Sequence, residues 1–200
     1  MLWYIKKNIL SFQSTFVVKY ELSQLVNEPC SCPVLINGSK FYPKRLFEIS
    51  PEYQARIEEV FTDMDHRPLF DISEAKHRLE NGFFFIILEN DSEILGWSWA
   101  AVNRVYFKDF NCFLPIKEKT AFSFNTYVKK QFRGRRLNQL IVHEKLLHLK
   151  KAGYDYIWGL IYPWNHSSIK SFTRMNWEII GKYYFMKFFF MNLRFPPKSI

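Results

Sequence analysis

The sequence from Val128 to Ile141, VKKQFRGRRLNQLI, gathers five positive side chains around one glycine, Gly134, and then becomes an apolar run with helical spacing. The charge is local. Residues 128–151 hold eight Lys or Arg against one acid, whereas residues 1–127 hold 14 basic and 16 acidic side chains. A local excess of positive charge suits an anionic ligand better than a uniformly basic surface does. The segment is therefore the first candidate for a binding site.

This segment lies between a predicted strand and a predicted helix. Residues 120–128 alternate Phe122 and Phe124 with smaller side chains, which indicates a strand, and residues 137–151 have helical spacing that Gly153 ends. A glycine-containing loop before a helix presents free backbone N–H groups, which attract phosphate together with the helix dipole. The Walker and dinucleotide patterns are absent. The pattern therefore leaves three interpretations of the basic loop: a phosphate cradle, a solvated basic turn or a nucleic-acid contact.

The rest of the chain predicts two helices, a β-hairpin, another strand and then alternating strands and helices. Ser50–Pro51 is a good helix start and predicts a helix over 51–61, while Asp71–Glu74 starts a second helix that Asn81–Gly82 ends. Further strands are predicted over 83–89, 94–102, 156–162 and 177–190, a helix over 165–175 and an edge strand over 16–20, whereas residues 103–119 are ambiguous. This order predicts a mixed α/β layer with helices on the faces of a sheet.

Length and composition fit one domain, because 200 residues with 48% hydrophobic side chains can bury a sizeable core. The three cysteines, Cys30, Cys32 and Cys112, do not make a disulfide framework, and the Cys30–Cys32 pair lacks the second pair that a zinc site needs. No apolar run approaches the roughly 20 residues of a membrane span, and the N-terminal residues lack the order of a signal peptide. We therefore expect a cytoplasmic protein without a metal or a transmembrane segment.

Two segments resemble motifs of the GCN5-related N-acetyltransferases, the GNAT superfamily. Gln131–Arg136, QFRGRR, is similar to the Q/R-x-x-G-x-G/A loop that binds the pyrophosphate of acetyl-coenzyme A in this family. Asn165–Trp177 is similar to the second motif, in which Asn, a small residue, Tyr and a Leu-Gly-Phe end recur. The two motifs stand in the family's order, so together they are more specific than either one alone.

The resemblance implies a fold, a domain organisation and an activity. The fold is a GNAT-like mixed, mostly antiparallel central sheet with a splayed strand pair and flanking helices. It would cover residues 45–200, which leaves residues 1–44 as an N-terminal appendage of unclear role. The activity is transfer of acetyl from acetyl-CoA to a primary amine of a small molecule, an amino sugar or a peptide. Assembly as a homodimer is left open.

The resemblance also implies the residues that bind the acyl donor. Main-chain groups near Tyr127 and Val128 would pair with the pantetheine arm or the acetyl group, and Asn165 and Ser168 would come from the second motif. The loop amides that would hold the pyrophosphate are those of Arg133, Gly134, Arg135, Arg136, Leu137 and Asn138.

Three residues depart from the family's pattern. Arg136 and Asn138 stand where small residues are common, and Phe172 stands where many members carry a tyrosine that protonates the departing thiolate. A phenyl ring cannot donate that proton. Phe172 therefore keeps open a catalytically silent CoA-binding protein as an alternative to an acyltransferase. The basic segment 128–151 keeps open a basic nucleic-acid-binding module, although nucleic acid is not the expected partner.

No catalytic base is identified from the sequence, because the predicted strand over 120–128 contains no acid. The weak candidates for an acid or base are Glu118, His143, His148, Asp155, Tyr183 and Tyr184. Four tryptophans could line an acceptor pocket or fill a core, namely Trp97, Trp99, Trp158 and Trp164.

Overall fold

The structure is a computed structural model and describes residues 10–25, 34–36, 38–66, 68–107, 112–188 and 191–196. Its strands are β1 (Leu10–Glu21), β2 (Val34–Ile36), β3 (Ser39–Leu46), β4 (Phe84–Glu89), β5 (Ile94–Ala101), β6 (Arg104–Phe107), β7 (Cys112–Pro115), β8 (Thr120–Val128), β9 (Tyr156–Ile161), β10 (Glu178–Phe188) and β11 (Met191–Phe195). Its α-helices are α2 (Pro51–Thr62), α3 (Ile72–Glu80), α4 (Leu137–Lys151) and α5 (His166–Arg174), and two short 3-10 turns are η1 (Leu22–Gln24) and η3 (Lys130–Phe132).

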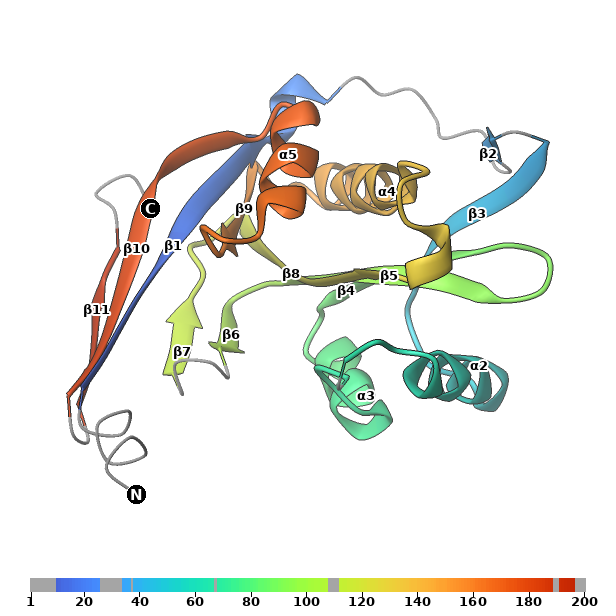
Figure 1. The fold of residues 1–200 in the computed structure, drawn as a ribbon, viewed down its shortest axis with the longest axis horizontal. Coiled ribbons are helices and arrows are strands. Elements are labelled where there is room, and N and C mark those ends of the chain that lie inside the picture. The colour runs from blue at the N-terminus through green and yellow to red at the C-terminus, as the bar shows by residue number, and fades with distance from the viewer. Residues whose placement is uncertain are drawn as a thin grey trace.

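Nine strands form one sheet in the order β11-β10-β1-β9-β8-β5-β4-β3-β2. Helices α4 and α5 cover one face, and α2 and α3 cover part of the other (Figure 1). All neighbouring strands pair antiparallel except β8 and β9, which are parallel. The mixed α/β class with a mostly antiparallel sheet and flanking helices is therefore confirmed.

Helix starts follow the local chemistry that the sequence predicts. The Ser50 side chain accepts a hydrogen bond from the backbone N–H of Tyr53 at the start of α2, and Pro51 occupies the first turn. The Asp71 side chain does the same for the N–H of Glu74 at the start of α3. Both predicted helices are confirmed. Their starts could be predicted because a cap of this kind depends only on residues three apart in the chain.

The strand predicted over residues 16–20 is real, but its predicted place at an edge is wrong. It belongs to β1, which lies inside the sheet and pairs antiparallel with β9 on one side and β10 on the other. Val17 and Val18 are consequently buried. Both partner strands come from the last third of the chain, and no local pattern reveals such distant pairing. The division at residue 44 stays a prediction, although β1 and the strands after it share one sheet.

The ambiguous region 103–119 contains a short hairpin, β6 paired antiparallel with β7. It lies on the same side of the large sheet as α3 (Figure 1). Cys112 on β7 is a free thiol, whereas Cys30 and Cys32 fall outside the described residues. Within the described ranges no group of three metal-ligating side chains comes together.

The centre of the sheet is buried on both faces, since every residue of β4 and β5 is buried. Toward α4 the core includes Ile86, Leu95 and Ile141, whereas toward α2 and α3 it includes Trp97 and Trp99. These two tryptophans are therefore core residues. Among the helices that the structure describes, none is both long and apolar enough to span a bilayer.

Candidate functional site

The two parallel strands β8 and β9 part halfway along their length. Their pairing ends at Ser123 and Gly159, whereas β8 continues beside β5 to Val128 and β9 continues beside β1 to Ile161. From Phe124 onward β8 therefore has no pairing with β9. This opening in the middle of the sheet is the splayed strand pair that the family resemblance implies.

A bulge in β8 lies at this opening. Trp99 pairs with Phe124 but Trp97 pairs with Tyr127, so β8 contains one extra residue in this interval. Asn125 lies in this interval with a φ of 48°, a left-handed conformation that one class of bulge uses. As a result Thr126 hydrogen-bonds to Ser98 from β5, with 2.7 Å between the two hydroxyl oxygens.

The basic loop connects the end of β8 to the start of α4. Gly134 has a φ of 82°, and an added Cβ there would meet no atom within 4 Å. Arg136 has a φ of 61° and occupies the N-cap of α4, where no side chain caps the helix. The first amides of a 15-residue helix thus lie beside a glycine in a left-handed turn, an arrangement suited to an anion.

A cleft of about 390 Å³ lies between this loop, the end of β8 and α5. We call it the loop cleft. It is lined by Thr126, Tyr127, Val128, Phe132, Arg133, Gly134, Arg136, Leu137, Asn138, Gln139, Ser167, Ser168, Lys170, Ser171, Phe172 and Arg174.

Eight of the ten predicted donor-binding residues line the loop cleft. The two that do not are Arg135 and Asn165. The guanidinium of Arg135 lies over the ring of Phe132. The side chain of Asn165 caps α5 by accepting from the N–H of Ser168 at 3.2 Å. The role of all ten residues in binding a cofactor stays a prediction.

Several residues that line the cleft are not among those predicted from the sequence, including Thr126, Lys170 and Arg174. Lys170 and Arg174 come from α5 and add positive charge opposite the loop. Their spacing of four residues on one helix is a signal that could have found them.

The positive field of residues 128–151 is smaller than the sequence suggests. Lys129 is buried, and its ammonium contacts Glu93 at 2.5 Å and Asp63 at 3.2 Å. Burial acts to lower the pKa of Lys129, but the hydrogen bonds to Glu93 and Asp63 outweigh it and raise this pKa. Arg133 is exposed and forms an ion pair with Asp65 at 2.9 Å. Lys129, one of the five positive side chains around Gly134 in the sequence, is therefore not available as an exposed charge.

Lys145 is also buried, although it is one of the eight positive side chains that the sequence places in residues 128–151. It is 0% exposed, and its Nζ donates hydrogen bonds of 2.6 Å to the hydroxyls of Ser98 and Ser123. Burial lowers the pKa of Lys145 to about 7. A spacing of four residues to buried Ile141 and to buried Leu149 was the signal that could have placed Lys145 on the inner face of α4.

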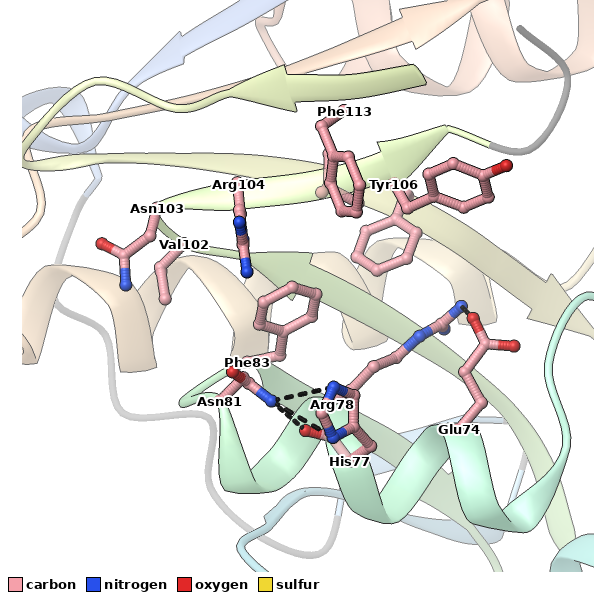
Figure 2. A pocket seen from close by; sticks show the side chains of 12 residues that line it. Glu74, His77, Arg78, Asn81, Phe83, Val102, Asn103, Arg104, Tyr106 and Phe113 are labelled. Atoms are coloured by element: carbon pink, nitrogen blue, oxygen red, sulfur yellow. Dashed lines mark hydrogen bonds and ion pairs between the residues drawn. The ribbon is translucent and has the colours of Figure 1, made fainter. Parts of the chain in front are cut away.

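A second cavity, of about 580 Å³, lies on the other face of the sheet between α3 and the β6–β7 hairpin (Figure 2). We call it the aromatic pocket. It is lined by Glu74, His77, Arg78, Asn81, Phe83, Val102, Asn103, Arg104, Val105, Tyr106, Phe113 and Phe124. In Figure 2 the rings of Phe83, Tyr106 and Phe113 lie around the space above α3.

The buried cation of the aromatic pocket is Arg78. Its guanidinium donates to Glu74 at 2.6 Å and lies 4.9 Å from the ring centre of Phe124 and 5.1 Å from that of Trp99. Burial lowers the pKa of Arg78, while Glu74 opposes the shift. Arg78 keeps its charge at any physiological pH, because guanidinium deprotonates only far into the alkaline range.

Phe172 lines the loop cleft and is buried, with its ring edge-on to Trp177 at 4.7 Å. Tyr183 is buried beside Phe185 on β10, and neither it nor Tyr184 lines the cleft. Of the remaining candidates, Glu118 and Asp155 are exposed, and His148 is 3.1 Å from Glu144 on the same helix. Of the other two tryptophans, Trp158 is buried against Phe122 and lines a third cavity, of about 420 Å³, together with Tyr183. Trp164 is 71% exposed and lines neither the loop cleft nor the aromatic pocket.

Comparison with known proteins agrees with this geometry. The acetyltransferase (GNAT) family model matches residues 45–177, so the chain belongs to the GNAT family of acetyltransferases. No curated protein matches.

Solved structures show the same fold at low sequence identity. A GCN5-related N-acetyltransferase from Kribbella flavida has a TM-score of 0.55 and 10% identity, covering 100% of this chain and 65% of that one. The glucosamine N-acetyltransferase region of a fungal multi-domain beta-N-acetylglucosaminidase has a TM-score of 0.61 and 13% identity, covering 97% of this chain and 22% of that one. A Drosophila protein has a TM-score of 0.60 and 11% identity, and this chain, covered over 92%, spans 54% of its length.

Proposed function

We propose that this protein transfers an acetyl group from acetyl-CoA, bound in the loop cleft, to a primary amine. The observation that carries the proposal is the coincidence of three features at one place: the opening between β8 and β9, the Gly134 turn, and the uncapped start of α4. The amides at the helix start and the cations Arg136, Lys170 and Arg174 suit the phosphates of the donor. The opening beside them suits its extended arm, which can pair with the free edge of β8.

The reaction requires a neutral amine that attacks the thioester carbonyl. A C–N bond forms, the C–S bond breaks, the amine loses a proton, and the thiolate of CoA gains one. Backbone N–H groups along the opened part of β8 can stabilise the negative charge that develops on the carbonyl oxygen.

The aromatic pocket is the place we propose for the acceptor amine. Phe124 lines it and lies on β8 only two residues before Thr126, which lines the loop cleft from the other face. An acyl group at the opening is therefore within reach from both sides of the sheet. The pocket's rings and the paired Arg78 and Glu74 suit a small organic amine, an amino sugar or a peptide end.

A silent CoA-binding protein is the second candidate, and Phe172 favours it. The ring lines the cleft without any hydroxyl that could protonate a leaving thiolate. The nucleic-acid alternative is weakened, because Lys129 and Lys145 are buried and Arg133 is paired with Asp65. Those three cations are not free to neutralise phosphates of a polyanion.

Two measurements test the proposal. Isothermal calorimetry with acetyl-CoA should show binding, and a saturating concentration of about 100 times the dissociation constant should stabilise the fold by about 2.7 kcal/mol. Thiol release should then be followed with a panel of polyamines, amino sugars and peptides. Binding without turnover across the panel would favour the silent binder, and absence of binding by a folded protein would refute both.

A further inference from the structure

A buried lysine lies directly beneath the loop cleft, in a position that no part of the proposed function uses. Lys145 projects from the inner face of α4 toward the sheet. Its ammonium contacts one hydroxyl on β5, Ser98, and one on β8, Ser123, each at 2.6 Å. Both serines are buried, so the contact is closed to solvent.

The Ser98 hydroxyl continues toward the cleft, whereas the Ser123 hydroxyl does not. Ser98 is 2.7 Å from the hydroxyl of Thr126, and Thr126 is part of the cleft lining. Ser123 does not line the cleft. Lys145 therefore has one branch that leads to the cofactor position and one that ends within the core.

The series Lys145–Ser98–Thr126 forms a hydrogen-bond chain. The direction of its first hydrogen bond follows from the chemistry of the lysine. An ammonium group has three donors and no acceptor, so the Ser98 oxygen must accept from Lys145. The Ser98 hydrogen is then available to Thr126, and the Thr126 hydrogen is available to a group in the cleft. A charged Lys145 thus leaves the hydrogen of each hydroxyl free to be donated toward the loop cleft.

The surroundings of Lys145 keep its proton exchangeable. Burial is the only cause of its lowered pKa. On the same helix, the side chains of Glu144 and His148 contact each other, with 3.1 Å between the carboxylate oxygen and Nε2. Arg45 of β3 places its guanidinium over the Phe84 ring of β4, and Lys150 donates to the Leu25 carbonyl that follows η1.

We propose that Lys145 is a proton store for the loop cleft and protonates the departing CoA thiolate through Ser98 and Thr126. The thiolate takes the Thr126 proton, Thr126 takes that of Ser98, and Ser98 takes one from the Lys145 ammonium, which becomes a neutral amine. Lys145 regains a proton along the same chain when CoA leaves and water enters the cleft. The inference rests on the proposed function, and it assigns to Thr126 the proton transfer that Phe172 cannot perform.

In this scheme Thr126 is the catalytic residue, since it touches the sulfur, while Ser98 and Lys145 are positioning residues that act through it. Two other hydroxyls of the cleft are engaged elsewhere, whereas the Tyr127 hydroxyl, which also belongs to a residue of the lining, is buried without a hydrogen-bond partner among the described residues. Ser171 accepts from Asn138 at 3.0 Å, and Ser167 donates to Asn165 at 3.0 Å.

The test measures the thiol of bound CoA and does not need the acceptor. The ratio of the dissociation constants of desulfo-CoA and CoA is measured by calorimetry from about pH 6 to about pH 9. If the hydrogen-bond chain stabilises the thiolate, the thiol of bound CoA ionises at a lower pH than that of free CoA. The affinity of CoA relative to desulfo-CoA then begins to rise at that lower pH. In the wild type we expect a gain of about tenfold, equal to a thiol pKa about one unit below that of free CoA.

The variants separate the two branches of the chain. Thr126→Val and Ser98→Ala should abolish the gain, because each breaks the path, and Lys145→Met should abolish it by removing the store. Thr126→Ser should keep it. Ser123→Ala is the matched control, since it also removes one hydroxyl bonded to Lys145 but leaves the path intact.

The outcomes distinguish the inference from the function on which it rests. If CoA binds and the ratio shows the same pH dependence in Thr126→Val, Ser98→Ala and wild type, the proton store is refuted and the proposed function stands. If neither CoA nor desulfo-CoA binds the folded wild type, the proposed function itself fails. If Lys145→Met does not fold, Thr126→Val against Thr126→Ser still decides the question.

Discussion

The loop cleft and the aromatic pocket lie on opposite faces of the same sheet and are built in opposite ways. The cleft consists largely of backbone and side chains from one continuous segment, Thr126–Gln139, completed by α5. The pocket is assembled from side chains of α3, the hairpin and β8, which are separated in the chain. A ligand common to a whole family can be bound by backbone groups, whereas an acceptor particular to one protein needs side chains. The difference explains why the sequence reveals the first site and not the second.

The largest effect that would test this contrast is expected at Gly134. Gly134→Val puts a β-branched side chain at a φ of 82° and in the path of the phosphates, so the affinity for acetyl-CoA should fall about a hundredfold, or about 2.7 kcal/mol. Gly153→Val is the matched control, because Gly153 has a φ of 83° and equal free space but lies at the other end of α4. Equal affinities of the two variants in calorimetry would show that the loop is not the cradle.

The buried cations beneath the two sites should differ in their response to pH. The pKa of Lys145 in the folded state, about 7, lies below its unfolded value of 10.5, so the unfolded state binds more protons between these values. Stability should therefore rise with pH above 7, by about 1.4 kcal/mol per unit. Lys145→Met should lack this contribution, so its free energy of unfolding in urea minus that of the wild type should fall from pH 7 to about pH 9. A constant difference would mean that Lys145 is not titrating. Arg78 has no comparable slope, since it stays charged.

Changes in the aromatic pocket should affect turnover and leave donor binding alone. Phe124→Leu removes a ring that lines the pocket and lies beside Arg78, and we expect turnover with the acceptor to fall about tenfold, or about 1.4 kcal/mol. Affinity for acetyl-CoA should not change. Leu35→Ala, on a side chain that is 66% exposed and lines neither cavity, is the control. A loss of acetyl-CoA affinity in Phe124→Leu would contradict the assignment of separate faces.

A smaller difference is expected between two neighbouring lysines of the loop. Lys129→Ala leaves Glu93 and Asp63 without their buried partner and should destabilise the fold by about 1–3 kcal/mol. Lys130→Ala removes an exposed charge and should change stability by less than about 0.5 kcal/mol. Urea unfolding of both variants checks this, and equal stabilities would mean that the Lys129 ion pairs contribute nothing.

The smallest effect is expected at Phe172. Phe172→Tyr adds one hydroxyl at nearly constant volume, so affinity for acetyl-CoA should be kept and turnover should be unchanged or higher. Steady-state rates with and without this change test it. Normal folding with lost turnover would show that the ring itself contacts the acceptor.

The parts of the molecule that the sequence predicts are those fixed by neighbours in the chain. The caps at Ser50 and Asp71 and the glycine turn before α4 depend on residues three or four apart. The same holds for the loop cleft, since most of its lining is contiguous.

The parts that the sequence does not predict depend on distant contacts. From the sequence, Lys129 is expected to be a surface charge. The fold places it beside Asp63 and Glu93, which are 66 and 36 residues away in the chain. From the sequence, Lys145 is counted among the charges of a basic helix. In the fold its ammonium donates instead to two buried serines, one on β5 and one on β8. Charge alone carries no information about such partners, and only the fold does.

The internal position of β1 has a consequence for the order in which the chain can fold. Its partners β9 and β10 leave the ribosome more than 130 residues after it. Until then the strand has no neighbour, and the sheet around the opening cannot close. Contacts of such long sequence separation slow folding, because the loop-closure entropy is lost before they form. Completion of the sheet beside the loop cleft during synthesis must therefore wait until β9 and β10 have been made.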